Sequence, residues 1–415
     1  MIQTSGRIVI VGAGHAGGTV AALLRQYGWQ GPITLLGDEP IAPYQRPPLS
    51  KAWLKGEADA ESLALKPLSF YAEAGIDLRL DTQATSADAN QKVVALASGE
   101  QIGFDHLILA TGAAARKLPI AGGDLRGVLS LRTAADAEAL KAALGPGKTL
   151  AVVGGGYVGL EAAASARALG AEVVVIEREA RILARVAGAV LSDFFQSYHA
   201  ARGVTFICAA GVEAFEGVGD QFAGVRLADG RLIAADAALV GVGASPNIGL
   251  ARQMGCACGQ GVIIDLNAMT SVADVYAIGD CTERPLPLYG VQGRLESVPN
   301  ALEQAKQAAA HLCGRPAPAP EAPWFWSDQY DLKLQIAGLP LHAVRAVMRG
   351  APPENPMDPA RFAIFHLDAE NHVQAVEAIN APAEFMMGRQ VLSSRKAVSP
   401  EKLADMSISM KEVAV

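Results

Sequence analysis

Short apolar runs bounded by glycine follow one another along the chain in the order expected of parallel strands joined by helices. The apolar run Ile8–Val11 leads into a glycine-rich turn at residues 12–17 and then into an alanine-rich segment with helical periodicity. A further apolar run, Ile33–Leu36, closes the unit. The order of strand, glycine turn, helix and strand predicts the βαβ unit of a doubly wound parallel sheet.

The same pattern occurs a second time. Residues 149–167 (TLAVVGGGYVGLEAAASAR) repeat residues 7–25 (RIVIVGAGHAGGTVAALLR) in outline, and the apolar run Glu172–Ile176 closes this second unit. Because a repeat of this length includes strand, turn and helix together, we expect two related modules in one chain.

The remaining runs predict how the modules are completed. A third apolar run at 107–109 and another at 275–278 have the character of buried strands, and residues 296–313 are predicted to form a helix. The proline-rich segment 314–323 indicates a linker. Alternating runs beyond it, at 333–337, 362–366 and Val373–Ile379, predict a small antiparallel sheet followed by a helical tail.

Both glycine motifs suit the pyrophosphate of a dinucleotide. Their glycines stand where the chain must turn tightly, let a phosphate approach the backbone, and pack the helix against the strand. The phosphate would lie on free N–H groups at the helix N-terminus. A single motif of this kind also occurs as a plain turn, so the prediction rests on its occurring twice. The residues concerned are Gly12, Gly14, Gly17, Gly154, Gly156 and Gly159.

An acidic residue follows the second strand of each module. Glu177 stands where a carboxylate accepts hydrogen bonds from both ribose hydroxyls and repels a 2′-phosphate, which favours NADH over NADPH. Arg178 beside it could instead pair with a phosphate, and Glu177 could be an ordinary solvated charge. In the first module either Asp38 or Glu39 could hold the adenosine ribose.

Composition and charge narrow the function. The 415 residues carry 35 basic and 42 acidic side chains, a net charge of −7, which argues against binding nucleic acid or a membrane through net charge. Five cysteines without a CxxC pair predict neither a disulfide framework nor a metal site, and favour a reducing, cytoplasmic location. The apolar segment 8–24 is interrupted by glycines and is shorter than the about 20 residues that cross a bilayer.

Several segments together resemble one family, the FAD-dependent, pyridine-nucleotide-dependent ferredoxin reductases that serve ring-hydroxylating dioxygenases and bacterial cytochromes P450. Of these segments, RPPLSK and WFWSDQ are specific to this group, and the others belong to a wider superfamily of flavoproteins that bind two dinucleotides. The segments are 12–17, 46–51 (RPPLSK), 110–112 (ATG), 154–159, 270–280 (TSVADVYAIGD) and Trp324–Gln329 (WFWSDQ).

The resemblance implies a glutathione-reductase-like α/β fold with two Rossmann-like dinucleotide-binding domains and a C-terminal α+β domain. It implies FAD and NADH as cofactors. Residues 1–115 and 246–320 would be the two parts of the FAD-binding domain, 116–245 the NAD-binding domain, and 321–415 the C-terminal interface domain.

The resemblance also implies roles for single residues. Lys51 would lie against the isoalloxazine, Arg46 near the pyrophosphate, and Asp280 on the ribityl chain. Glu161 would pair with Lys51 and line the nicotinamide face, although by its position alone it could be an acid favoured by the helix dipole. The resemblance further implies that Ala110, Thr111, Gly112 and Trp326 bind a cofactor, and that Arg132 lies beside the flavin.

The implied partner is a small [2Fe–2S] ferredoxin that feeds a cytochrome P450 or a Rieske oxygenase. Because such ferredoxins are acidic, we expect a basic docking patch, with Arg294, Arg315 and Lys333 as candidates. The alternatives are a rubredoxin reductase or NADH oxidase on the same scaffold, and a non-enzymatic redox-signalling flavoprotein. No cysteine precedes Cys208, so a thiol relay beside the flavin is not expected, and Cys281 is expected to be buried and inert.

Overall fold

The computed structural model describes residues 5–414, which divide into two compact units. The first unit consists of residues 5–45, 60–114 and 246–325, and the second of residues 46–59, 115–245 and 326–414. The functional domain boundaries expected from the sequence stay a prediction.

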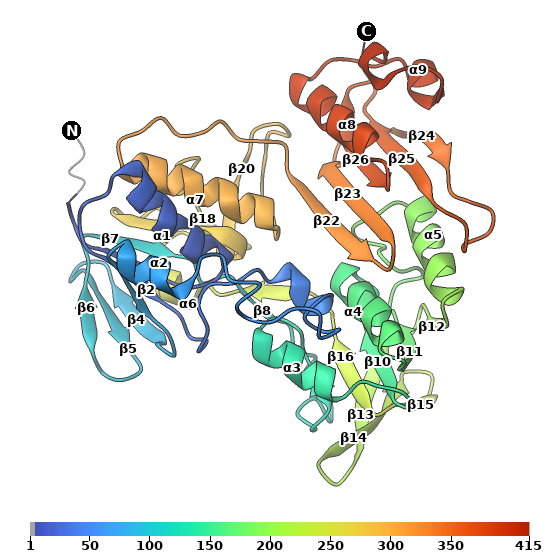
Figure 1. Ribbon diagram of the computed structural model, residues 1–415, viewed down its shortest axis with the longest axis horizontal. Helices are drawn as coiled ribbons and strands as arrows, with labels where there is room; N and C mark the ends of the chain where they lie inside the picture. The colour runs from blue at the N-terminus through green and yellow to red at the C-terminus, as the bar shows by residue number, and fades with distance from the viewer. Residues whose placement is uncertain (1–4, 415) are drawn as a thin grey trace. The chain divides into compact units, whose positions relative to one another are not determined.

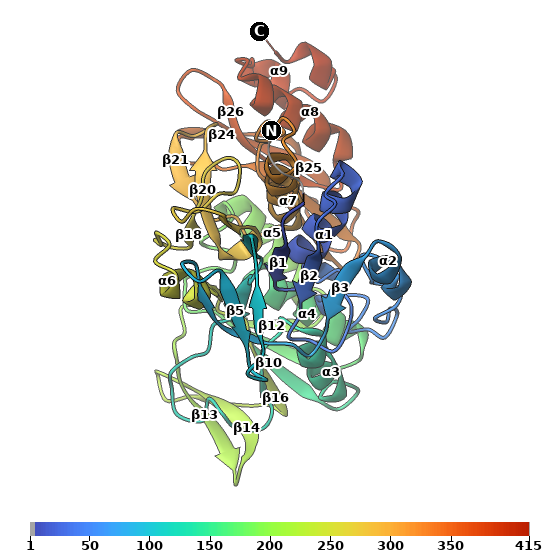
Figure 2. The same cartoon turned by 90° about the vertical axis from the view of Figure 1, so that its left-hand side faces the viewer.

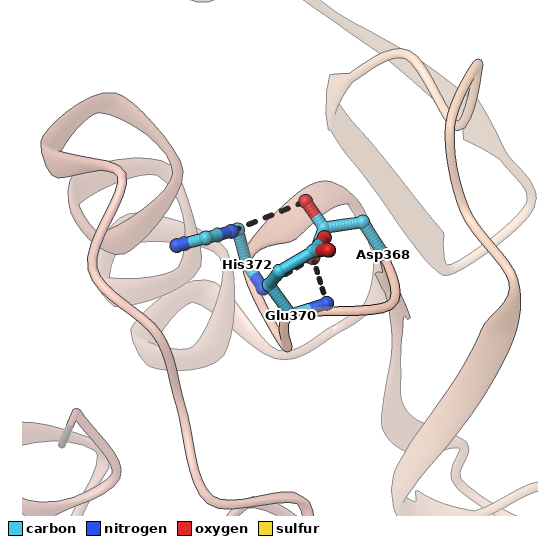
Figure 3. Close-up of side chains that lie close together, drawn as sticks. All are labelled: Asp368, Glu370 and His372. Atoms are coloured by element: carbon cyan, nitrogen blue, oxygen red, sulfur yellow. Dashed lines mark hydrogen bonds and ion pairs between the residues drawn. The ribbon is translucent and has the colours of Figure 1, made fainter.

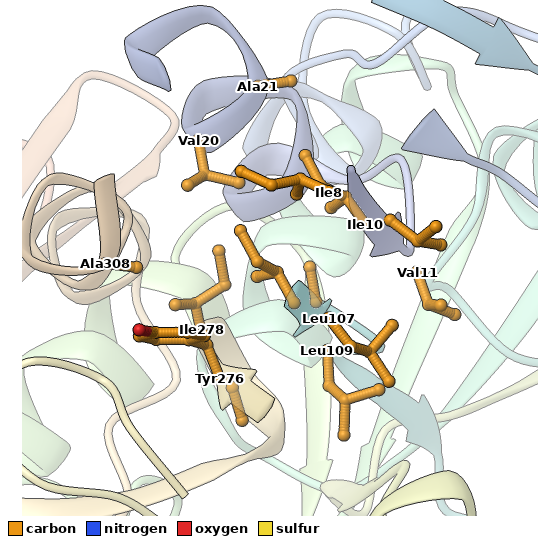
Figure 4. Close-up of a cluster of buried hydrophobic side chains, with 14 of the residues drawn as sticks. Ile8, Ile10, Val11, Val20, Ala21, Leu107, Leu109, Tyr276, Ile278 and Ala308 are labelled. Atoms are coloured by element: carbon orange, nitrogen blue, oxygen red, sulfur yellow. The ribbon is translucent and has the colours of Figure 1, made fainter. Parts of the chain in front are cut away.

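The first unit is built around a five-stranded parallel sheet in the order β19-β7-β1-β2-β3. Helices α1 (His15–Tyr27) and α7 (Val298–Leu312) lie side by side against it (Figure 1). The apolar side chains of the two helices and of the central strands form the core shown in Figure 4. The strands are β1 (Ile8–Val11), β2 (Ile33–Leu36), β3 (Ile76–Arg79), β7 (His106–Leu109) and β19 (Val275–Ala277).

Smaller elements complete the first unit. The segments between the main strands form two three-stranded sheets, β4-β5-β6 and β18-β20-β21, neither of which the sequence analysis assigned as a sheet. These strands are short and partly exposed, so their apolar pattern is weak. The elements are α2 (Leu68–Glu73), β4 (Ala84–Asp88), β5 (Val93–Leu96), β6 (Gln101–Gly103), α6 (Gly249–Gln253), β18 (Val262–Ile263), the 3₁₀ turn η2 (Gly279–Cys281), β20 (Thr282–Leu286) and β21 (Val291–Gly293).

The second unit contains a parallel sheet of the same kind, in the order β12-β11-β10-β16-β9. Helix α4 packs on its central strands, and β13 and β14 form a hairpin (Figure 2). The elements are η1 (Pro47–Ser50), β9 (Val128–Leu129), α3 (Ala134–Ala142), β10 (Thr149–Val153), α4 (Tyr157–Ala168), β11 (Glu172–Ile176), α5 (Ala189–Ala200), β12 (Val204–Ile207), β13 (Val212–Val218), β14 (Gln221–Leu227), β15 (Leu232–Ala234) and β16 (Ala237–Val240).

The C-terminal part is an antiparallel sheet in the order β22-β23-β26-β25-β24, against which α8 packs. The predicted antiparallel sheet and helical tail are therefore confirmed, with β22 and β24 as additional strands. The elements are β22 (Trp324–Gln329), β23 (Leu332–Gly338), β24 (Arg345–Ala351), β25 (Arg361–Leu367), β26 (Val373–Ile379), α8 (Pro382–Ser394), α9 (Pro400–Ala404) and η3 (Met410–Glu412); two short strands at the unit boundaries are β8 (Ala113–Ala115) and β17 (Ala244–Pro246).

The expected fold class, two Rossmann-like modules with a C-terminal α+β domain, is thus confirmed. Among residues 5–414 no helix has both the length and the apolar character needed to cross a membrane. The cytoplasmic location stays a prediction.

Candidate active site

The first glycine turn packs against the loop that follows β7. Gly12 has a φ of +109°, a left-handed conformation that favours glycine, and a Cβ on it would lie 2.2 Å from the carbonyl oxygen of Ala110. A Cβ on Gly17 would lie 1.9 Å from the carbonyl oxygen of Gly12. Gly14, the N-cap residue of α1, has no side chain with which to cap the helix. The first N–H groups of α1 therefore form a backbone cradle suited to an anion.

The turn that contains Asp280 lies beside this cradle. Strands β19, β7 and β1 are neighbours and parallel, so the loops at their carboxyl ends share one edge of the sheet. Gly279 has a φ of +82°, and a Cβ on it would lie 3.1 Å from the Cβ of Ala16 in the first turn of α1. Asp280 follows directly in η2. The first unit thus brings Asp280, the loop after β7 and the glycine turn to one edge.

Hydrogen bonds to residues outside the motifs hold these loops. The Thr111 hydroxyl donates to the carbonyl oxygen of Asn247 at 2.6 Å, and the Asn247 side-chain amide donates back to the carbonyl oxygen of Thr111 at 2.9 Å. Gln304 of α7, which is completely buried, accepts from the N–H of Gly279 at 2.6 Å and donates to the Thr282 hydroxyl at 2.8 Å. Neither Asn247 nor Gln304 was predicted from the sequence. The signal at Gln304, an amide on an apolar helix face, indicates burial only after the fold is known. Asn247 lies between β17 and α6, where the sequence has no periodic pattern.

The two acids that follow β2 differ in their surroundings. Glu39 accepts a hydrogen bond of 2.8 Å from the Tyr44 hydroxyl, and its side chain is half-buried. Asp38 is exposed. The structure therefore fixes Glu39 more firmly than Asp38, and which of them holds a ribose stays a prediction.

The second glycine turn repeats the geometry of the first. Gly154 has a φ of +107°, and a Cβ on it would lie 2.5 Å from the carbonyl oxygen of Gly241. A Cβ on Gly159 would lie 2.4 Å from the carbonyl oxygen of Gly154. Gly156, the N-cap residue of α4, differs from Gly154 and Gly159. A Cβ on Gly156 would meet no described atom within 4 Å. Packing requires the first and third glycines, whereas the second faces open space at the helix N-terminus.

Glu177 at the end of β11 is held at this turn. One carboxylate oxygen accepts from the N–H of Gly155 at 2.7 Å, and the other accepts from the N–H of Glu179 at 2.9 Å. The exposed Arg178 pairs with the carboxylate of Glu179 at 2.9 Å. Glu177, the acid expected to bind the ribose, thus lies against the glycine turn. Arg178, the cation that could instead bind a 2′-phosphate, is paired with Glu179.

An ion pair with a buried carboxylate joins the RPPLSK segment to α4. The Nζ of Lys51 lies 2.6 Å from Oε2 of Glu161, and the two side chains are 19% and 6% exposed. The Ser50 hydroxyl donates to the same carboxylate oxygen at 2.6 Å, and the Ser165 hydroxyl donates to the carbonyl oxygen of Ser50 at 2.7 Å. Turn η1 is therefore attached to α4 by polar contacts, and the structure brings Lys51 and Glu161 together.

The other oxygen of Glu161 is held from the C-terminal sheet. Ser327 in β22 donates to Oε1 of Glu161 at 2.6 Å, and Gln329 donates through Nε2 to the Ser327 hydroxyl oxygen at 3.1 Å. Oε1 of Gln329 lies 2.7 Å from Nε2 of His199 on α5. Burial lowers the pKa of His199 to about 4, so this imidazole is neutral at neutral pH. Ser327 and Gln329 were not predicted as site residues, although both lie in the WFWSDQ segment.

Arg46 and Arg132 also lie together. Nη1 of Arg46 donates to the carbonyl oxygen of Arg132 at 2.5 Å. The N–H of Arg132 donates to the carboxylate of Asp136, which forms the capping box of α3 with Thr133. Trp326, next to Ser327 in β22, is half-buried. These contacts show how the backbone around both arginines is fixed.

The predicted site residues thus form two groups, one in each unit, and their roles stay predictions. The first unit holds Gly12, Gly14, Gly17, Asp38, Glu39, Ala110, Thr111, Gly112 and Asp280. The second unit holds Arg46, Lys51, Arg132, Gly154, Gly156, Gly159, Glu161, Glu177 and Trp326.

All five cysteines are free. Cys281 is completely buried, as expected, and burial raises the pKa of its thiol. Burial likewise raises the pKa of the Cys256 and Cys258 thiols. A thiol with a raised pKa is a poor nucleophile at neutral pH, so these side chains have the character of structural thiols.

Within residues 5–414 one group of three side chains has the spacing of metal ligands, namely Asp368, Glu370 and His372 in the turn between β25 and β26 (Figure 3). Asp368 already accepts from the N–H of His372 at 2.8 Å and from the side-chain amide of Gln374 at 2.8 Å. This is the pattern of a hydrogen-bonded turn, in which the acid stabilises the local backbone.

Two family models cover most of the chain. Residues 6–305 match the model described as pyridine nucleotide-disulphide oxidoreductase, and residues 324–414 match the model described as reductase C-terminal.

Similar proteins are found along the full length. The chain is 48% identical over 412 residues to a probable ferredoxin reductase of Castellaniella defragrans, covering 99% of each chain. It is 39% identical over 417 residues to putidaredoxin reductase of Pseudomonas putida, covering 99% of this chain and 97% of the relative. Its structure matches a chain of the covalent putidaredoxin reductase–putidaredoxin complex with a TM-score of 0.94, 39% identity and 98% coverage of both chains. The resemblance seen in the motifs is therefore confirmed: the chain belongs to the pyridine nucleotide-disulphide oxidoreductase family and, within it, to the ferredoxin reductases.

Proposed function

We propose that this chain takes hydride from NADH to FAD and passes single electrons to a [2Fe–2S] ferredoxin that feeds a cytochrome P450 or a ring-hydroxylating oxygenase. The observation that carries the proposal is the ion pair of Lys51 with Glu161, whose buried carboxylate lies on α4 just after the second glycine turn. A chain with two dinucleotide modules needs such fixed groups mainly for positioning, because the cofactors supply the chemistry.

The residues of the first unit fit FAD. The backbone cradle at the start of α1 suits a pyrophosphate, since its N–H groups and the helix dipole favour negative charge. The bonds of Thr111 to Asn247 and of Gly279 to Gln304 fix the neighbouring loops. A carboxylate at Asp280 on such a loop can accept hydrogen bonds from hydroxyls of a ribityl chain.

The residues of the second unit fit NADH. The open space at Gly156 lies at the N-terminus of α4, where a pyrophosphate would be favoured. The carboxylate of Glu177 lies at the same turn and would accept from the ribose hydroxyls. The carboxylates of Glu177 and Glu179 lie on either side of Arg178 in the sequence and would repel a 2′-phosphate, so we propose NADH as the preferred donor.

When bound, FAD and NADH supply the redox chemistry, in which hydride passes from nicotinamide to flavin and electrons then leave one at a time. The role of the protein is to hold charged side chains in fixed positions. Lys51 offers a cation that would stabilise developing negative charge in a partly desolvated site. Glu161 fixes that cation through an ion pair of 2.6 Å.

The names of the relatives support a ferredoxin as the acceptor, since they describe a probable ferredoxin reductase and a reductase joined to putidaredoxin. Of the three candidate docking cations, Arg294 is partly buried and paired with Glu296. Arg315 and Lys333 are exposed, and the guanidinium of Arg315 lies 4.8 Å from the ring of Tyr27. We therefore retain Arg315 and Lys333 as candidates for contact with an acidic partner.

An anaerobic titration tests the proposal. The purified protein is expected to show the absorption of bound flavin, to be bleached by NADH, and to regain colour when an oxidised [2Fe–2S] ferredoxin is added. Protein that is colourless and cannot be reconstituted with FAD would contradict the proposal.

The same titration separates the alternatives. Faster reoxidation by rubredoxin than by any ferredoxin would identify a rubredoxin reductase, and rapid reoxidation by oxygen alone an NADH oxidase. A reduced protein that reacts slowly with every acceptor would favour a redox-signalling role.

A further inference from the structure

We propose that Ser327, in the C-terminal sheet, is a positioning residue for hydride transfer that acts through Glu161, with Gln329 and His199 holding Ser327 in turn. The inference rests on the proposed function and deepens it, because it makes the C-terminal sheet part of the reaction site as well as a candidate surface for the partner.

The carboxylate of Glu161 is fixed at both oxygens. Ser327 donates to Oε1, and Ser50 and Lys51 donate to Oε2, all three at 2.6 Å. Since every one of these partners donates, the carboxylate acts purely as an acceptor. Rotation of the carboxylate plane would break bonds on both sides, so Ser327 determines how Glu161 presents its other oxygen to Lys51.

The hydrogen bonds that connect His199, Gln329 and Ser327 to Glu161 all run in the same donor-to-acceptor direction. The Ser327 proton is used on Glu161, so its oxygen accepts from the Nε2 group of Gln329. This orientation of the amide turns Oε1 of Gln329 to His199, which must then donate from Nε2. The tautomer leaves Nδ1 of His199 without a proton, and within residues 5–414 that atom has no hydrogen-bond partner. Each donor in the series points towards Glu161, and such aligned bonds strengthen one another.

Water cannot replace these contacts easily. His199 is completely buried, Ser327 and Gln329 are each 1% exposed, and Glu161 is 6% exposed. If the Ser327 hydroxyl is removed, Oε1 of Glu161 loses its partner in a site that solvent scarcely reaches. The carboxylate then reorients towards Lys51 and Ser50, and the ammonium group moves with it. The expected consequence is a slower chemical step with little change in nucleotide affinity.

The test uses the holoenzyme with Ser327→Ala, alone and in a Glu161→Gln background. Anaerobic stopped-flow measurements give the limiting rate of flavin reduction and the apparent dissociation constant of NADH. We expect Ser327→Ala to lower the limiting rate about tenfold, the effect of one lost hydrogen bond to a charged group, and to change the dissociation constant less than about twofold. In the Glu161→Gln background the same substitution should change the rate less than about twofold. An equal loss in both backgrounds overturns the proposal, because Ser327 would then not act through Glu161.

A second readout does not depend on turnover. The carboxylate stretching band of Glu161, identified from the infrared difference between wild-type protein and Glu161→Gln, should shift in Ser327→Ala without NADH present. An unchanged band overturns the proposal. A wild-type chain that binds no flavin would overturn the proposed function, and the infrared comparison would still decide whether Ser327 orients Glu161.

Control variants separate positioning from general loss of packing. Ser192→Ala removes another completely buried serine, which donates to the carbonyl oxygen of Ile182 at 2.6 Å on the same unit. It should lower stability to a similar extent and leave flavin reduction unchanged. Gln329→Leu, which keeps the Ser327 hydroxyl, should slow reduction in the same direction by a smaller factor, and Ser327→Thr should restore most of the rate. If Ser192→Ala slows reduction as much as Ser327→Ala does, the proposal fails.

Discussion

The ammonium group of Lys51 lies 2.6 Å from the carboxylate of Glu161, although the two residues belong to segments far apart in the sequence. Lys51 follows the 3₁₀ turn of the RPPLSK segment, and Glu161 lies in the helix that begins at the second glycine turn. The pair therefore joins the motif that is specific to this group of reductases to the motif that is common to dinucleotide-binding modules.

Removing one partner of this ion pair should lower the free energy of unfolding more than replacing both partners does. Lys51→Met is expected to lower the free energy of unfolding by about 3 kcal/mol, because it leaves a buried carboxylate without its cation. Adding Glu161→Gln should recover most of that loss, since a neutral amide is buried at lower cost. Urea unfolding followed by circular dichroism measures the free energy of unfolding of Lys51→Met, of Glu161→Gln and of the double variant. If the double variant is as unstable as the two single losses added together, the pair is not coupled as the structure indicates.

Substitutions of two glycines in the second turn should distinguish an effect on NADH binding from an effect on folding. Gly156→Ala is expected to keep the melting temperature, because its Cβ would meet no described atom within 4 Å. The same Cβ would enter the space proposed for the pyrophosphate and should weaken NADH binding at least about tenfold. Calorimetric titration with NADH and thermal unfolding measure the two effects.

Gly159→Ala is the matched comparison. Its Cβ would lie 2.4 Å from the carbonyl oxygen of Gly154, so this variant should lose thermal stability or fail to fold. A Gly156→Ala protein with wild-type affinity for NADH would place the nucleotide elsewhere.

Coenzyme preference should depend on the two acids after β11. Glu177→Ala removes the proposed ribose acceptor and should reduce the ratio of kcat/KM for NADH over NADPH about tenfold or more. Glu179→Ala should reduce the ratio more weakly by freeing Arg178 to meet a 2′-phosphate. Glu172→Ala, at the opposite end of the same strand, should leave the ratio unchanged. A ratio that all three variants leave alone would contradict the assignment of Glu177.

His199 should make stability depend on pH. Burial lowers its pKa from 6.5 to about 4. Between pH 6.5 and 4 the imidazole therefore binds a proton in the unfolded chain but stays neutral in the folded chain. The contribution of His199 is complete above about pH 6.5 and is lost as the pH falls to 4, by about 3 kcal/mol in total. Denaturant unfolding at several pH values should show this loss in the wild type and a correspondingly smaller loss in both His199→Gln and His199→Phe. Parallel pH profiles for the three proteins would show that His199 is not the group responsible.

Electron transfer to the ferredoxin should depend on salt. Lys333 is exposed, and Lys333→Glu is expected to slow reduction of an acidic [2Fe–2S] ferredoxin severalfold at low ionic strength and hardly at all at high ionic strength. Reduction of the flavin by NADH should be unchanged in the same variant. Wild-type rates that do not respond to ionic strength would exclude electrostatic docking.

The local sequence pattern was sufficient to predict the two modules. Ile8–Val11 and Ile33–Leu36 form strands with the bounds that the apolar runs predict, because strands buried on both faces are continuously apolar. The glycine turns were readable because a positive φ at Gly12 and Gly154 leaves few other residues possible. The weakly patterned strands β4, β13 and β24 were not predicted, since partly exposed strands carry little apolar signal.

By itself, then, the sequence determined the paired modules, the C-terminal sheet, the family and the segments from which the site is built. Only the tertiary structure decided which polar groups meet: Ser327 with Glu161, Gln304 with Gly279, and Asn247 with Thr111. The physical reason is that apolar periodicity and backbone conformation are local properties, whereas the partner of a buried polar group is selected by packing between distant segments, where each donor must find an acceptor away from water.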